Sequence, residues 1–106
     1  MKRIALIVIG HFKPEWDKLS EEEQAAFATR VGRAARKVGV TPVVGYKLTT
    51  QGSFLEVWEA DDKGTLDRFK RELDALDYKK YYDQVLMQGE RSEAWITSTE
   101  ERQARG

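Results

Sequence analysis

The chain has 106 residues, which is enough for one hydrophobic core but too short for two independent ones. Its 18 basic residues balance 18 acidic residues, so the sequence lacks the positive field that draws proteins to nucleic acids and anionic membranes. There is no cysteine, which excludes disulfides, thiolate metal sites and thiol catalysis, and a reducing, cytoplasmic location is expected.

The first expected strand covers residues 3–9, where apolar and mostly β-branched side chains follow one another without alternation. This pattern is typical of a strand that is buried on both faces. A turn-prone stretch around Pro14 follows. Ser20 and Glu23 then have the spacing of a capping box that opens a helix, and Gly39 is suited to end it. One apolar stripe runs along this helix.

A second strand is expected from about Val40 to Thr49 and a third from Phe54 to Ala60, joined by a hairpin turn at residues 51–53. Asp61 or Asp62 can cap the second helix. The apolar stripe of that helix consists of Leu66, Phe69, Leu73 and Leu76.

The last strand is expected at roughly Gly89 to Thr97, after a short helical turn that carries Tyr78, Tyr81 and Tyr82. Residues 98–106 are polar and are expected to form a frayed tail. Residues 1–97 therefore make up a single domain.

This order of elements, βαββαβ, predicts an α+β, ferredoxin-like fold in which two helices cover one face of a four-stranded antiparallel sheet. Both faces of the first strand are apolar, however. They consist of Ile4, Leu6 and Val8 on one side and Ala5, Ile7 and Ile9 on the other. Because the helices can cover only one set, we expect the other to pack against a second copy of the chain in a homodimer.

Three polar residues are candidates for chemistry. His11 is the only histidine, and it follows the most apolar strand, so we expect it to be the polar group nearest the deepest pocket. It can act there as a base or a haem ligand, and the alternative is an ordinary loop histidine. No histidine spacing suits a metal, so no metal site is expected. Glu56 and Glu59 point to opposite faces of the third strand. Because both faces of this strand should be covered, we expect one of the two to be mostly buried with a partner. A covered carboxylate is either paired with a cation such as Lys47 or Arg91, or has a raised pKa that suits a base.

Aromatic residues are numerous enough either to line a pocket or to fill the core and an interface. The tryptophans and Tyr46 are the candidates for a pocket, and Tyr78, Tyr81 and Tyr82 for a pocket wall or a dimer contact. The tryptophans are Trp16, Trp58 and Trp95. An RNA-recognition domain is excluded, because the third strand carries acidic rather than basic residues.

Two groups of residues resemble known families. The stretch 53–61, SFLEVWEAD, with Leu66 and Phe69 after it, resembles the third strand and second helix of antibiotic biosynthesis monooxygenase-like proteins of the dimeric α/β-barrel superfamily. The stretches PEW at 14–16, LSEE at 19–22 and YYDQV at 81–85 are similar to the darcynin proteins of that superfamily. The monooxygenase-like proteins commonly carry a histidine in the second helix where this sequence has Phe69.

The resemblance implies a small-molecule enzyme that carries out cofactor-independent oxygenation, or a related proton abstraction, on an aromatic or polyketide-like substrate. His11 or Glu56 would be the base and Tyr46 or Tyr82 the hydrogen-bond donor. The expected ligand-binding residues are Trp16, Trp58, Phe69, Tyr78, Tyr81 and Arg91. The alternative is a noncatalytic ligand-binding or structural homodimer, including a haem-binding variant with His11 as axial ligand.

Overall fold

The computed structural model describes residues 3–91 and has the predicted βαββαβ order, with two short helices added. The main elements are β1 (Ile4–Phe12), α2 (Glu21–Val38), β2 (Thr41–Leu48), β3 (Ser53–Ala60), α3 (Lys63–Ala75) and β4 (Tyr82–Glu90). The short helices are α1 (Pro14–Asp17), before α2, and η1 (Tyr78–Lys80), before β4. Within this part of the chain, no helix has the length and apolar character needed to cross a membrane.

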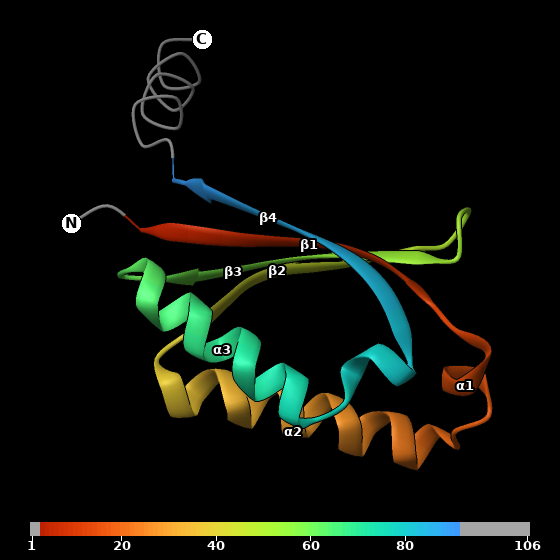
Figure 1. Ribbon diagram of the computed structural model, residues 1–106. Coiled ribbons are helices and arrows are strands. Elements are labelled where there is room, and N and C mark those ends of the chain that lie inside the picture. Colours follow the sequence, from red (N-terminus) through yellow and green to blue (C-terminus); the bar gives the residue numbers. More distant parts are fainter. Residues whose placement is uncertain (1–2, 92–106) are drawn as a thin grey trace, which may run out of the picture.

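The four strands form one antiparallel sheet in the order β2-β3-β1-β4, so β1 and β3 are central and β2 and β4 are edges. Figure 1 shows α2 and α3 side by side on one face of this sheet. On the other face no helix or strand of the described residues is packed. The predicted α+β fold with a four-stranded antiparallel sheet is therefore confirmed.

The helix ends follow the local signals in the sequence. The Ser20 hydroxyl accepts a hydrogen bond from the Glu23 amide (3.1 Å), and the Glu23 carboxylate accepts one from the Ser20 amide (3.0 Å). Gly39 ends α2 with a φ of +86°, a conformation that glycine adopts without strain. Asp62, rather than Asp61, caps α3 by accepting a hydrogen bond from the Thr65 amide (2.8 Å).

The hydrophobic core lies between the helices and the sheet. Leu6, Leu66 and Phe69 are fully buried there, and Leu6 shares its face of β1 with Val8. Leu66, Phe69 and Leu73 are buried along α3, as the stripe predicted. The sequence periodicity therefore identified the covered side of α3, and the structure shows that Leu6 and Val8 form the set of β1 that the helices cover.

The predicted start of the last strand, at Gly89, was wrong. β4 runs from Tyr82 to Glu90 and pairs with β1 over its whole length, from Tyr82 opposite Phe12 to Glu90 opposite Ile4. The side chains of β4 that face the helices include glutamines, so the apolar alternation that marks an ordinary strand is weak here. Residues 92–97 of the expected strand, Trp95 and the tail 98–106 lie outside the described residues.

The sheet face turned away from the helices is called the open face below. The register places Ile7 between Val57 on β3 and Met87 on β4, and Ile9 between Leu55 and Val85. Across the sheet, Tyr46 on β2 pairs with Leu55. Tyr46, Val85 and Met87 are 61%, 62% and 42% exposed. An apolar surface thus extends across all four strands.

Glu59 lies at one end of the open face and is only 6% exposed. Its carboxylate accepts two hydrogen bonds from the Arg91 guanidinium, at 2.8 and 3.0 Å, and Arg3 lies 3.6 Å away. The expectation that one carboxylate of the third strand is buried with a partner is therefore confirmed. Arg91, expected to bind a ligand, instead binds Glu59.

Candidate functional site

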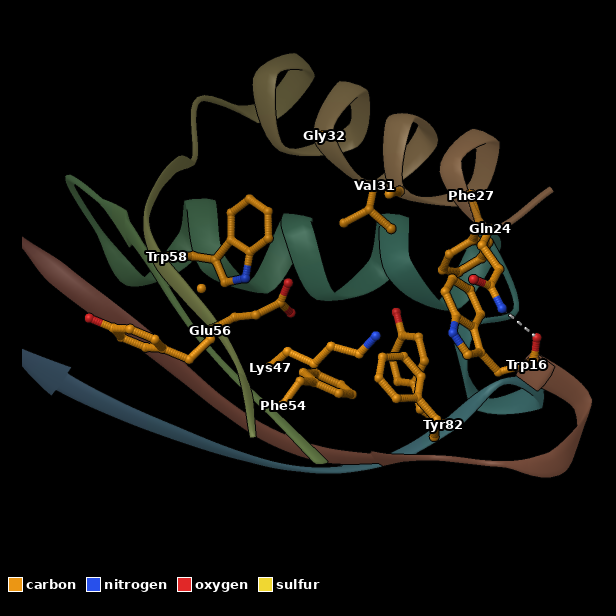
Figure 2. Close-up of a pocket in the computed structure, with 14 residues that line it drawn as sticks. Trp16, Gln24, Phe27, Val31, Gly32, Lys47, Phe54, Glu56, Trp58 and Tyr82 are labelled. Atoms are coloured by element: carbon orange, nitrogen blue, oxygen red, sulfur yellow. Dashed lines mark hydrogen bonds between the residues drawn. The ribbon is translucent and has the colours of Figure 1, made fainter. Parts of the chain in front are cut away.

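A cavity of about 420 Å³ lies between α2 and the part of the sheet formed by β2 and β3 (Figure 2). Most of the side chains around it are aromatic or aliphatic. Its lining consists of Phe12, Trp16, Gln24, Phe27, Ala28, Val31, Gly32, Gly45, Tyr46, Lys47, Phe54, Glu56, Trp58 and Tyr82. This size and composition are typical of sites that bind small organic molecules.

Aromatic rings in mutual contact form one end of the cavity. Trp16 on α1 stacks on Phe12, with ring centroids 5.1 Å apart, and Tyr82 meets Phe54 edge to face at 5.2 Å. The Phe54 ring lies over Gly10 of β1, where a Cβ atom would come within 2.5 Å of it. The glycine therefore allows this ring to lie flat against the sheet.

Small residues leave the space that the cavity occupies. Gly32 on α2 and Gly45 on β2 both belong to the lining, and a Cβ atom added to either would meet nothing within 4 Å. Ala28 lies one helical turn before Gly32 on the same side of α2. Because β2 is an edge strand, this gap lies at the border of the sheet, and we call it the α2–β2 mouth.

Glu56 brings a carboxylate into the apolar cavity. It pairs with Val8 and Gly45 in the sheet, so it points to the helix side, and Figure 2 shows its carboxylate directed into the cavity. Burial raises the pKa of Glu56, and a hydrogen bond from Trp58 offsets part of this effect. Within residues 3–91 it forms no ion pair with a lysine or arginine.

Tyr82 supplies a phenol to the same cavity. Burial, the charge of Glu56 and the neighbouring Tyr78 together raise the pKa of Tyr82 far above its ordinary value. The phenol therefore stays protonated at neutral pH and can donate a hydrogen bond. A half-buried base and a permanent hydrogen-bond donor thus share one apolar site.

Four of the predicted site residues meet in the cavity: Glu56, Tyr82, Trp16 and Trp58. Tyr46 contributes to the lining, but its partner across the sheet is Leu55, so its side chain belongs to the open face. The residues before and after it, rather than Tyr46 itself, face the helices.

His11 is not at the cavity, so the expectation that it is the polar group nearest the deepest pocket was wrong. β1 continues past Gly10 to Phe12, and strand alternation then turns Phe12 to the helices and His11 to the open face. His11 is exposed there, opposite Ser53 and Asp83.

The remaining predicted aromatic residues pack against the residues that line the cavity. Phe69 is fully buried in the core and contacts Trp58 with a centroid distance of 5.0 Å. Tyr78 is buried 5.6 Å from Tyr82, and Tyr81 packs edge to face on Trp16 at 5.9 Å. These rings hold lining residues in place and are not themselves part of the lining.

Sequence reasoning missed the contribution of α2. Gln24, Phe27, Val31 and their neighbours recur at helical spacing and line the cavity together. Gln24 also donates a hydrogen bond to the Trp16 carbonyl oxygen (3.0 Å), which ties α1 to α2. The signal that could have identified this wall is Gly32, because glycine in a helix interior is costly and often has a packing or functional reason.

A family model described as "Family of unknown function (DUF6616)" matches residues 5–103. The chain belongs to the DUF6616 family. No curated protein matches this DUF6616 chain. Among solved structures, it is similar to a mutant chlorite dismutase from Candidatus Nitrospira defluvii, with a TM-score of 0.69 and 16% sequence identity. The match covers 86% of the DUF6616 chain and 41% of the dismutase chain, and at this identity it shows a shared fold alone.

The cavity of the DUF6616 chain does not fit a haem site of the kind considered from the sequence. The only histidine of the chain is on the open face, and the lining contains no imidazole or thioether. Tyr82 is the phenol that could bind iron as an anion, but its raised pKa opposes ionisation. The cavity therefore lacks the axial histidine that the haem-binding alternative requires.

Proposed function

We propose that this chain is a small-molecule enzyme in which Glu56 removes a proton from a planar aromatic or polyketide-like substrate bound in the cavity. The observation that supports this proposal is a carboxylate with a raised pKa that faces an aromatic-lined cavity without a paired cation. Such a carboxylate holds a proton more strongly than one in water. It is therefore a better base at neutral pH than an exposed glutamate.

Tyr82 would act together with Glu56. As Glu56 takes a proton from carbon next to a carbonyl or phenol, negative charge moves to the substrate oxygen. The neutral Tyr82 phenol can donate a hydrogen bond to that oxygen, in a site lined mostly by apolar side chains. The aromatic side chains Trp58 and Phe54 would hold the planar substrate between the sheet and α2.

The finer reaction is cofactor-independent oxygenation. A substrate CH₂ group loses one proton to Glu56, and the resulting carbanion transfers electrons to molecular oxygen, which is the oxidant. Addition of oxygen gives a peroxide at this carbon, which loses its remaining C–H proton as the O–O bond breaks and the carbonyl forms. The two protons removed from the CH₂ group and the outer oxygen atom leave as one water. Carbon is oxidised, O₂ is reduced, and no other reductant is needed.

The test is oxygen uptake with anthrone, a planar three-ring ketone with an acidic CH₂ group. We expect the wild-type chain to accelerate uptake and Glu56→Gln to reduce the rate about 100-fold or more. Glu22→Gln is the matched control, since Glu22 is exposed at the start of α2 and outside the cavity. Binding of anthrone without turnover would favour the noncatalytic alternative, and a Glu56→Gln variant with full activity would contradict the role of Glu56.

We also propose that the chain is a homodimer that pairs through its open face. The support is the apolar surface that crosses all four strands, on which Tyr46 and Val85 are more than half exposed. Soluble monomers rarely expose continuous apolar patches beyond a few hundred Å² or so. The cavity lies on the opposite side of the sheet, so each copy would keep its own site.

A further inference from the structure

Lys47 is a charged cavity residue that the proposed reaction does not use. It pairs with Phe54 in the sheet, so strand alternation turns it to the helix side, and Figure 2 shows its side chain directed into the cavity. Within residues 3–91 its ammonium group forms no ion pair and no hydrogen bond with a side chain. A cation without an anionic partner thus borders an aromatic site.

Glu56 does not neutralise Lys47, although both face the cavity. Glu56 pairs with Gly45, two residues before Lys47 on β2. Two residues of strand correspond to about 7 Å along the sheet. One or two fused aromatic rings span that length, so a single planar ligand can contact both groups at once.

The α2–β2 mouth places Lys47 where an anionic group can reach it. Gly45 and Lys47 are consecutive inward-facing positions on the edge strand, and Gly32 leaves the facing side of α2 open. Lys47 is exposed even though it lines the cavity. An anion held there would keep part of its hydration, which limits the cost of removing it from water.

We propose that the ligand of this cavity is a planar aromatic molecule with an anionic substituent, such as a carboxylate, which Lys47 binds at the α2–β2 mouth. This inference rests on the proposed function and specifies its substrate class. Lys47 binds the anionic end of the ligand, and the ligand atom that loses a proton then lies over Glu56 at the inner end of the cavity. The apolar ring system fills the space between them.

Isothermal titration calorimetry with two matched probes tests this inference. Naphthalene-2-carboxylate carries the anion, and naphthalene-2-carboxamide has nearly the same shape without the charge. We expect the carboxylate to bind about 10-fold more tightly, which is what one charge-assisted contact supplies. Lys47→Met should remove this preference, while Lys47→Arg should retain it.

Lys63→Met is the control, because Lys63 is an exposed lysine on α3 outside the cavity. It should leave the affinity for both probes unchanged. Equal affinities for the two probes, or a preference that survives in Lys47→Met, would overturn the inference, and Glu56-dependent oxygen uptake with anthrone would then still uphold the proposed function. If neither probe binds and anthrone is not turned over, both proposals fail.

Discussion

Glu56 and Glu59 are three residues apart on one strand, and the structure gives them opposite environments. Glu59 on the open face is satisfied by the Arg91 guanidinium, whereas Glu56 on the helix side has the indole of Trp58 and forms no ion pair within residues 3–91. Burial without a paired cation favours the neutral acid at Glu56, whereas Glu59 is held in a bidentate contact with an arginine. The same residue type is therefore suited to proton transfer at one position and to stability at the other.

The titration of Glu56 should appear in the stability of the chain. Its folded pKa lies above the unfolded value of about 4.3, so the folded state binds this proton more strongly. The free energy of unfolding therefore falls as the pH rises from the unfolded to the folded pKa, and stays lower above both. We expect Glu56→Gln to be more stable than wild type at pH 7, with a difference that shrinks below about pH 4. Urea unfolding of both proteins across this range measures it, and a pH-independent difference would contradict it.

Removing the buried carboxylate of Glu59 should destabilise the fold. Arg91 and Arg3 would lose their partner, and because both arginines are partly exposed we expect Glu59→Gln to cost about 2 kcal/mol. A double-mutant cycle with Arg91→Met, followed by urea unfolding, isolates the pair. A coupling energy near zero would show that the bidentate contact adds nothing.

At the level of elements, glycines decide where the helices and strands touch the cavity. A Cβ atom added to Gly10 on β1 would lie 2.5 Å from the Phe54 ring and 2.8 Å from the Asp83 carbonyl oxygen. Gly32 on α2 and Gly45 on β2 face empty space instead. One glycine is thus required by packing, and the other two keep the α2–β2 mouth open.

The substitution of two glycines by alanine should have opposite effects. Gly10→Ala forces the Phe54 ring or the strand to shift, and we expect it to cost about 1–3 kcal/mol of unfolding free energy. Gly32→Ala meets no atom and restricts the unfolded chain, so we expect it to add about 0.5–1 kcal/mol. Thermal unfolding of the two variants compares them directly. If the two substitutions changed the unfolding free energy equally, the Phe54 ring would be able to move away from the new Cβ atom at position 10 without loss of stability.

At the level of the whole molecule, the two faces of the sheet have different roles. The helix side contains the core and the cavity, and the open face presents an apolar surface with Glu59 and its arginines at one end. Packing two open faces together would bury area on the scale of a standard interface, roughly 1,600 Å². At about 25 cal/mol per Å² this would exceed the cost of association.

Sedimentation equilibrium at micromolar concentration tests the dimer. We expect wild type at twice the monomer mass, and we expect Val85→Lys to shift it to the monomer because a buried, unpaired ammonium would oppose association. Ala26→Lys on the exposed surface of α2 is the control and should remain dimeric. A wild-type chain at monomer mass without concentration dependence would contradict the proposal.

The sequence by itself determined the order of elements, the caps and the buried side of α3, because these depend on local signals. Each of these signals is formed by residues that are close in the sequence, as in the Ser20 capping box, the Gly39 cap and the stripe from Leu66 to Leu73. The position of β4, in contrast, could not be predicted from local signals. It depends on pairing with β1 across the sheet, and no local pattern within 82–90 expresses that pairing.

Only the tertiary structure decided which candidate residues form the site. Trp16, Glu56 and Tyr82 meet because α1, β3 and β4 are brought together around β1 by long-range pairing and packing. Because β1 extends to Phe12, His11 lies within the strand, and the alternation of side chains directs it to the open face, away from the cavity. Local patterns set the elements, whereas the register between distant strands set the site.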